Sequence, residues 1–148
     1  MTPHPVHLWH EALHQADPTD LKALIHKDCI FHSPILFKPQ EGGVLTRMYL
    51  TAAFWMFKGG DHFEYVKEFL DDDAAVLEFN SVIDGIRIDG IDMITWNRDG
   101  KIIEFKVMLR PLKAIEKVGQ EMMNQLEKLS IKDKVKIKAD SLIRKLIK

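Results

Sequence analysis

The chain has 148 residues, a formal net charge of −1, 46% hydrophobic residues and 29% charged residues, which are values typical of one soluble globular domain. Residues 130–148 hold seven Lys or Arg against two Asp, a net charge of +5, which leaves −6 for residues 1–129. An acidic body of this kind argues against nucleic-acid binding.

Two further features of the composition bear on location. No apolar run reaches the length of a membrane span, and the N-terminus lacks the basic start and apolar stretch of a signal peptide. The single cysteine, Cys29, excludes an internal disulfide and is compatible with a reducing compartment. We therefore expect a cytoplasmic protein.

The first part of the chain has helical periodicity. Apolar residues recur at spacings of three and four from Val6 to Ala16, which predicts a first helix. Asp17 can cap a second helix, whose apolar side includes Ile25. The elements expected next are a short strand over residues 28–34 and a third helix over residues 46–57.

The period then changes to that of strands. Four extended segments are expected over residues 62–70, 74–83, 86–96 and 101–110. Asp-rich, Asp-Gly and Asn-Arg-Asp-Gly sequences separate them, and such residues favour hairpin turns. From Leu112 to Leu129 the helical period returns. This order predicts an α+β fold, in which a curved, mostly antiparallel sheet packs on three N-terminal helices and one C-terminal helix.

This layout, with FHSP after the second helix and GIDMITW followed by DGKIIEFKVMLRPLKAI near the end, resembles the SnoaL-like branch of the nuclear transport factor 2-like, or ketosteroid isomerase-like, superfamily. The resemblance covers roughly residues 5–125. It implies that residues 1–129 form a domain with a cone-shaped sheet, a pocket and a homodimer. The nearest subgroup is bacterial and of undefined function. Because this fold hosts enzymes and binding modules, the chemistry must be argued from the residues.

The sequence HEALH at residues 10–14 matches the zinc-binding motif H-E-x-x-H. A zinc hydrolase is a remote reading, since nothing upstream of His10 can form a supporting sheet and Asp17-Pro18 ends the helix just after His14. The interpretation we prefer is that these residues form a solvated helix face. Adventitious metal binding is the second alternative, ahead of catalytic zinc. We expect no metal site and no cofactor.

Asp92 is the candidate catalytic residue. It is an isolated acid among Ile91, Met93 and Ile94, a setting that favours a buried carboxyl group with a raised pKa. The resemblance implies that it occupies the position of the acid that hydrogen-bonds the developing enolate in ketosteroid isomerase. A purely structural Asp, bonded to backbone or to Trp9, is the alternative.

Two other residues that an isomerase of this family needs, a general base and a tyrosine, are missing from their expected positions. The family places an acidic general base before a proline at the end of the first strand, where this chain has Ser33-Pro34. The neighbouring His32 should point to the opposite face of the strand. The first helix has no tyrosine, and Trp9 is its only aromatic residue. We therefore do not predict steroid isomerisation.

Alternation along the last strand places Ile103, Phe105, Val107 and Leu109 on its concave side and Arg110 on its convex side, where an ion pair or a dimer contact is expected. Aromatic and Met residues between Tyr49 and Phe63, including Trp55, are expected to form the wall of an apolar cavity. The expected ligand-binding residues are Trp9, Leu13, Ser33, Phe54, Phe57, Ile94, Phe105, Val107 and Leu109.

The basic segment 130–148 lies beyond the resemblance. Ile131, Val135, Ala139, Leu142 and Leu146 recur at helical spacing, which predicts a basic amphipathic helix. Its Lys side is interpreted as a solvated face, with a partner chain or an anionic membrane surface as alternatives. The sequence favours a module that binds a small hydrophobic ligand without catalysis, and the alternative is an acid–base isomerase, cyclase or hydratase that uses Asp92.

Overall fold

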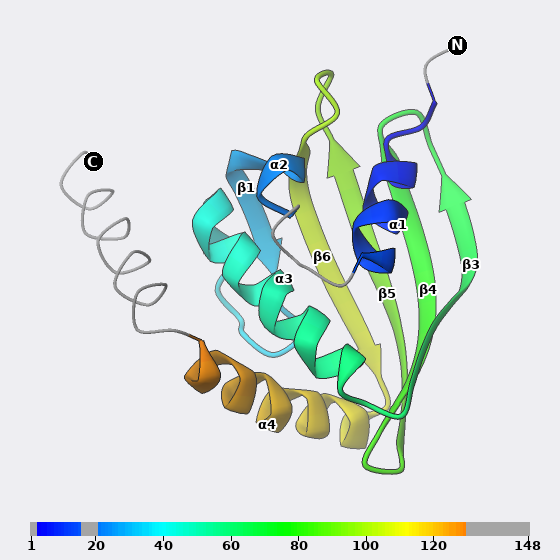
Figure 1. Cartoon of the computed structure of the whole chain (residues 1–148), viewed down its shortest axis with the longest axis vertical. Helices are drawn as coiled ribbons and strands as arrows, with labels where there is room; N and C mark the ends of the chain where they lie inside the picture. Colours follow the sequence, from blue (N-terminus) through cyan, green and yellow to red (C-terminus); the bar gives the residue numbers. More distant parts are fainter. Residues whose placement is uncertain (1–2, 16–20, 130–148) are drawn as a thin grey trace, which may run out of the picture.

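The computed structural model describes residues 3–15 and 21–129 and contains one sheet with helices on its inner side (Figure 1). The elements, in chain order, are α1 (Val6–His14), α2 (Leu21–Leu24), β1 (Ile25–His32), β2 (Gln40–Glu41), α3 (Gly43–Lys58), β3 (His62–Leu70), β4 (Ala74–Ile83), β5 (Ile86–Trp96), β6 (Ile102–Arg110) and α4 (Leu112–Lys128).

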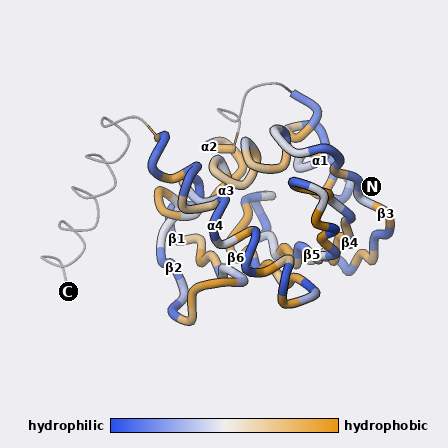
Figure 2. Tube along the Cα trace, turned by 90° about the horizontal axis from the view of Figure 1, so that it is seen from below, coloured by the Kyte–Doolittle hydropathy of each residue, from blue (hydrophilic) through white to orange (hydrophobic). Residues whose placement is uncertain are grey.

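The six strands are ordered β2-β1-β6-β5-β4-β3. All neighbours are antiparallel except β1 and β6, which run parallel. The predicted α+β fold with a curved, mostly antiparallel sheet is therefore confirmed. Figure 2 shows α1, α2 and α3 together on one side of the strands, while α4 extends from the end of β6 across the end of the layer.

Hairpin chemistry fixes the meander. Asp84 and Gly85 have φ values of 50° and 76°, the pair of positive angles that a tight two-residue hairpin turn needs. Strands β3, β4 and β5 occupy the ranges that the sequence predicts, and β6 begins one residue later. Along β4 buried and half-buried residues alternate strictly, so one face of this strand belongs to the core.

The first half differs from the prediction in three details. Helix α2 has only four residues, and Ile25 begins β1 instead of ending that helix, because its side chain enters the core beside the sheet. The short strand β2 was not predicted. Helix α3 begins at Gly43, three residues early, after Gly42 has reversed the chain at a φ of 111°. Ala16, Asp17 and the basic segment 130–148 lie outside the described residues.

The core fills the space between the inner face of the sheet and the helices. Trp9, Phe31 and Phe105 belong to one cluster of buried apolar residues, and Met56 and Phe79 belong to a second cluster nearer α4. Strand β6 enters this core with Ile102, which is 1% exposed, and not with Ile103 as predicted. A register shift opposite Thr95 and Trp96 inserts one extra residue and reverses the alternation there.

Within the described residues, no helix is long and apolar enough to cross a membrane.

Candidate functional site

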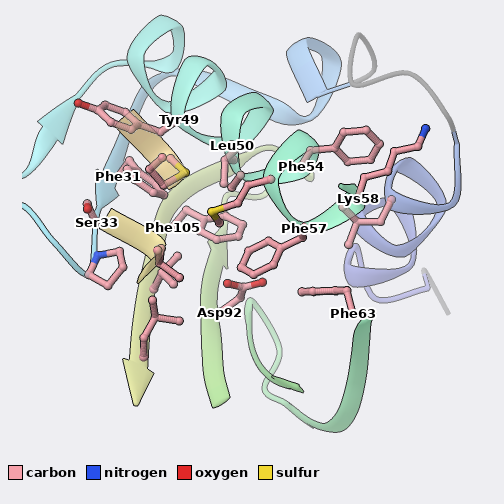
Figure 3. Close-up of a pocket in the computed structure, with 18 of the residues that line it drawn as sticks. Phe31, Ser33, Tyr49, Leu50, Phe54, Phe57, Lys58, Phe63, Asp92 and Phe105 are labelled. Carbon is pink, nitrogen blue, oxygen red and sulfur yellow. The ribbon is translucent and has the colours of Figure 1, made fainter. Parts of the chain in front are cut away.

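The structure contains a cavity of about 530 Å³ between the inner face of the sheet, the helices and the loop after β1 (Figure 3). Its walls are mainly aromatic and aliphatic, and Asp92 lies among them beside Phe57. In the view of Figure 3, Ser33 and Tyr49 lie at one end of the cavity and Lys58 at the other. A volume of this size is typical of sites for small organic molecules.

Most of the residues expected at a ligand site line this cavity. They are Trp9, Leu13, Ser33, Phe54, Phe57, Phe105, Val107 and Leu109, together with Asp92. Ile94 does not line it, because its side chain is fully buried in the core cluster next to Trp96. Trp55 lies on the outer side of α3, 41% exposed, where its ring faces the Lys58 ammonium group.

Asp92 belongs to a chain of hydrogen bonds across three elements. The Tyr65 hydroxyl on β3 donates to Asp92 Oδ2 on β5 at 2.5 Å. Trp9 Nε1 on α1 donates to the Tyr65 hydroxyl oxygen at 3.1 Å. The predicted alternative contact of Trp9 with Asp92 is therefore indirect, through Tyr65. Because Trp9 has only a donor and the hydroxyl has one proton, the direction of the chain is fixed.

Burial raises the pKa of Asp92 to about 7, and the hydrogen bond from Tyr65 opposes this shift. The pKa of Tyr65 is also raised, first by burial and then by the charge of Asp92 and the bond to it, so the phenol stays protonated at neutral pH. Near pH 7, Asp92 therefore exists in both protonation states.

The second carboxyl oxygen of Asp92, Oδ1, is not engaged by the hydrogen bond from Tyr65. Within residues 3–15 and 21–129, Asp92 makes one hydrogen bond, at Oδ2, and no buried polar side-chain atom lacks a hydrogen-bond partner. Since Asp92 lines the cavity, we infer that Oδ1 is open to it. It can donate a proton when Asp92 is neutral and accept a hydrogen bond when Asp92 is ionised.

Ser33 has a structural use at the same site. Its Oγ accepts hydrogen bonds from the backbone N–H groups of Ile35 and Leu36, at 3.0 and 3.3 Å. It therefore shapes the turn after β1. His32 points outward, with Nε2 3.6 Å from Glu104.

Tyr65 is the functional residue that sequence reasoning missed. It lies two positions after Phe63, which was expected in the cavity wall, so period-two alternation along β3 would have placed both side chains on the inner face.

The side chains of the HEALH motif do not come together as metal ligands in the described residues. His10 Nε2 lies 2.7 Å from Glu68 Oε1 on β3, and Glu11 is exposed. Residues 3–15 and 21–129 contain no group of three His, Cys, Asp or Glu side chains that could hold a metal ion. His14 instead lies at the edge of the cavity.

Arg110 lies on the outer face of the sheet, as expected. Its guanidinium group is 3.0 Å from Asp89 Oδ2 on β5, and Arg87 contacts the other oxygen of Asp89 at 3.3 Å. These are exposed ion pairs, remote from the cavity.

A curved sheet that closes on helices around an apolar cavity with one buried carboxyl group defines a cone-shaped pocket protein. Residues 6–105 match the SnoaL-like domain, and the chain belongs to this family. Its solved neighbours place it in the ketosteroid isomerase-like superfamily. It also shares the fold of an NTF2-like protein.

Three solved structures illustrate the similarity. A steroid delta-isomerase from Pseudomonas aeruginosa is 33% identical, with a TM-score of 0.78 over 83% of this chain and 89% of that chain. An uncharacterized protein with a cystatin-like fold from Silicibacter pomeroyi is 23% identical, with a TM-score of 0.75 over 84% and 86%. An NTF2-like protein of unknown function from Mesorhizobium loti is 18% identical, with a TM-score of 0.63 over 72% and 88%. No curated protein matches the sequence significantly.

Proposed function

We propose that the protein binds one small apolar molecule in its cavity, and that an oxygen atom of this molecule hydrogen-bonds to Asp92 Oδ1. The observation that carries the proposal is the carboxyl group of Asp92, hydrogen-bonded to Tyr65 at Oδ2, in a cavity whose walls are otherwise mainly aromatic and aliphatic. An apolar body gains free energy by leaving water, and one polar contact then fixes its orientation.

The chemistry of Asp92 favours a carbonyl group as that polar contact. A neutral carboxyl group offers its proton from Oδ1 because Oδ2 already accepts the proton of Tyr65. With the pKa raised to about 7, the neutral form is present at physiological pH. A ligand hydroxyl group fits the ionised form in turn, so the site accepts either group according to pH.

The proposal is tested with two ligands of nearly the same shape, acetylnaphthalene and ethylnaphthalene. The ketone is expected to bind about three- to tenfold more tightly below pH 7, which corresponds to one net hydrogen bond. Isothermal titration calorimetry measures both affinities. The preference should persist in Asp92→Asn, whose amide can still donate, and disappear in Asp92→Leu.

Equal affinities of wild-type protein for the ketone and the hydrocarbon would contradict the contact with Asp92. No binding of either compound, nor of larger polycyclic ketones, would contradict the cavity as a ligand site.

We propose acid–base catalysis on a small cyclic or polyketide-like substrate as the second candidate, with Asp92 as the acid. The carboxyl proton would pass from Oδ1 to a substrate carbonyl oxygen while water removes a proton from the adjacent carbon, which gives an enol. The similarity to a steroid delta-isomerase supports this candidate. The absence of an acid at Ser33 counts against the isomerase reaction itself.

Deuterium uptake separates the two candidates. In heavy water, an enolising enzyme would exchange the methyl protons of acetylnaphthalene faster than buffer does, and Asp92→Asn would lose the acceleration. Binding with no accelerated exchange supports the non-catalytic module. Mass spectrometry of the ketone measures the exchange.

We also propose that the protein works in the cytoplasm.

We further propose that two copies pair through the outer face of the sheet. Met108 is 45% exposed at the centre of that face, where it lies beside Ile91. An exposed Met next to another apolar side chain and a pair of Arg residues resembles the composition of interface cores and rims.

A further inference from the structure

A ligand needs a route to Asp92, because this residue is only 7% exposed. The cavity residues that reach solvent show where such a route can lie. On one side they are apolar, since Ile35 and Leu36 of the β1–β2 loop (residues 33–39) are 42% and 44% exposed and Met123 of α4 is 60% exposed. The other exposed lining residues are polar or charged, namely His14, Gln15 and Lys58. An apolar ligand favours the apolar opening, between the β1–β2 loop and α4.

Ile35 and Gly119 bring the β1–β2 loop and α4 into contact. Figure 1 shows this loop descending toward the helix. Ile35 packs over Gly119, where an added Cβ would lie 3.6 Å from Ile35 Cδ1, an ordinary van der Waals distance. Both residues line the cavity, so their contact forms part of its wall. Because Gly119 has no side chain, the loop approaches the backbone of the helix closely.

The β1–β2 loop is held together internally but is lightly attached to the helices. Ser33 Oγ accepts the backbone N–H groups of Ile35 and Leu36 at 3.0 and 3.3 Å, which stabilises the turn. Within residues 3–15 and 21–129, residues 34–38 make no hydrogen bond to a helix. Phe37 is fully exposed and contributes little packing. Segments with few buried apolar contacts and few hydrogen bonds to their surroundings open at a low cost in free energy.

We propose that the β1–β2 loop is the gate of the cavity. Ile35 rests on Gly119 in the closed state, and the ligand enters and leaves when the loop moves away from α4. The inference rests on the proposed function, since a gate has a role only if the cavity takes a ligand. An apolar contact can break and re-form without leaving a buried polar group unpaired. The gate therefore sets the rates of binding and release and leaves the affinity unchanged.

A disulfide across the contact tests the proposal. Ile35 Cγ1 and Cγ2 lie 3.9 and 3.8 Å from the Cβ position of residue 119, so the two Cβ atoms are about 4–5 Å apart, close to the spacing in a disulfide. Ile35→Cys is therefore combined with Gly119→Cys. The native Cys29 is buried and should not take part. Comparison of the oxidised and reduced forms of one protein separates closure of the loop from the effects of the substitutions.

Stopped-flow fluorescence of Trp9, which lines the cavity, follows the binding of acetylnaphthalene. The oxidised double variant should bind and release the ketone at least about tenfold more slowly than the reduced form, with a dissociation constant unchanged within about twofold. Ketone bound before oxidation should stay trapped until the disulfide is reduced. The single variants Ile35→Cys and Gly119→Cys are the matched controls, and the oxidant should not change their rates.

Three results would overturn the gate. Equal rates in the oxidised and reduced forms would show that the ligand enters elsewhere, for example at the end of the cavity that Lys58 lines. A failure of the two cysteines to cross-link would show that residues 35 and 119 do not meet. A weaker affinity with an unchanged release rate would make the loop a fixed part of the wall.

The same measurements separate the gate from the proposed function. The proposed function stands in each of these three cases if the reduced and wild-type proteins bind the ketone and Asp92→Leu loses the preference for it. If the wild-type protein binds no ketone, the proposed function fails and the gate fails with it.

Discussion

Tyr65 donates its only proton to Asp92 Oδ2 at 2.5 Å, and this bond determines what the other carboxyl oxygen can do. It leaves Oδ1 as the oxygen that carries the exchangeable proton of Asp92. Tyr65 is itself held by Trp9, so residues from α1, β3 and β5 set the chemistry of one oxygen atom. The site is therefore defined by tertiary contacts between elements that are distant in sequence.

Removal of this bond should raise the pKa of Asp92 above its value of about 7, because the hydrogen bond from Tyr65 favours the ionised form. Tyr65→Phe removes the donor and leaves Trp9 Nε1 without its acceptor, so stability should also fall by about 1 kcal/mol. A ¹³C NMR titration of Asp92 measures the pKa. Tyr49→Phe is the control, since the Tyr49 ring stacks on Phe31 and the hydrogen bond to Asp92 comes from Tyr65. A lower pKa in Tyr65→Phe would contradict this role.

The raised pKa of Asp92 also predicts how stability depends on pH. The folded state retains this proton up to about pH 7, whereas an unfolded chain releases it near 3.8. The contribution is therefore fully present below pH 3.8, declines as pH rises toward 7 and is constant above that. Its size is about 4 kcal/mol for an isolated group. Asp92→Asn should remove this decline, so the variant gains stability relative to wild type between pH 4 and pH 7.

Urea unfolding at several pH values measures this difference. A difference in stability between the two proteins that is the same at pH 4 and at pH 7 would show that Asp92 titrates normally in the folded state.

Gly90 allows the sheet to close beneath the cavity. A Cβ at this position would lie 2.4 Å from Phe79 Cζ and 2.7 Å from Leu109 Cδ2. Gly90→Ala should therefore cost about 1–3 kcal/mol and displace Leu109, a residue of the cavity wall. Gly119→Ala is the matched control in α4, where the added methyl group meets only ordinary contacts and should stabilise the helix by about 0.5–1 kcal/mol. Thermal unfolding compares both variants, and equal effects would be inconsistent with this packing.

The proposed dimer predicts an effect of charge on the outer face. Met108→Asp should convert the dimer to a monomer, because a charge replaces an apolar contact at the centre of the interface. Leu8→Asp, at an exposed position of α1, should not. Light scattering coupled to size-exclusion chromatography measures the mass. A wild-type monomer at micromolar concentration would refute the dimer.

Much of the fold follows from local chemistry in the sequence. The turn at Asp84-Gly85 and the alternation along β4 predict the hairpin, since both signals come from neighbouring residues. The start of β1 at Ile25 was missed because a short apolar run fits a helix or a strand equally well. Parallel pairing of β1 with β6 depends on contacts between segments more than 70 residues apart, which no local pattern encodes.

The candidate site was also predictable only in part. Asp92 was identified because an isolated acid interrupts apolar residues on a strand. Its contact with Tyr65 depends on how β3 and β5 lie on either side of β4, so composition alone does not reveal it. Ile103 was misplaced because one extra residue in β6 reverses the alternation, and such bulges have no sequence signal here.

The most direct test of the central claim is the ¹³C NMR titration of the Asp92 carboxyl group with acetylnaphthalene and with ethylnaphthalene. If the ketone binds the neutral carboxyl through Oδ1, it should raise the apparent pKa of Asp92 above about 7, and the hydrocarbon should raise it less. An Asp92 titration that saturating ketone leaves unchanged would contradict the account, because the ligand would then bind without contact to this oxygen.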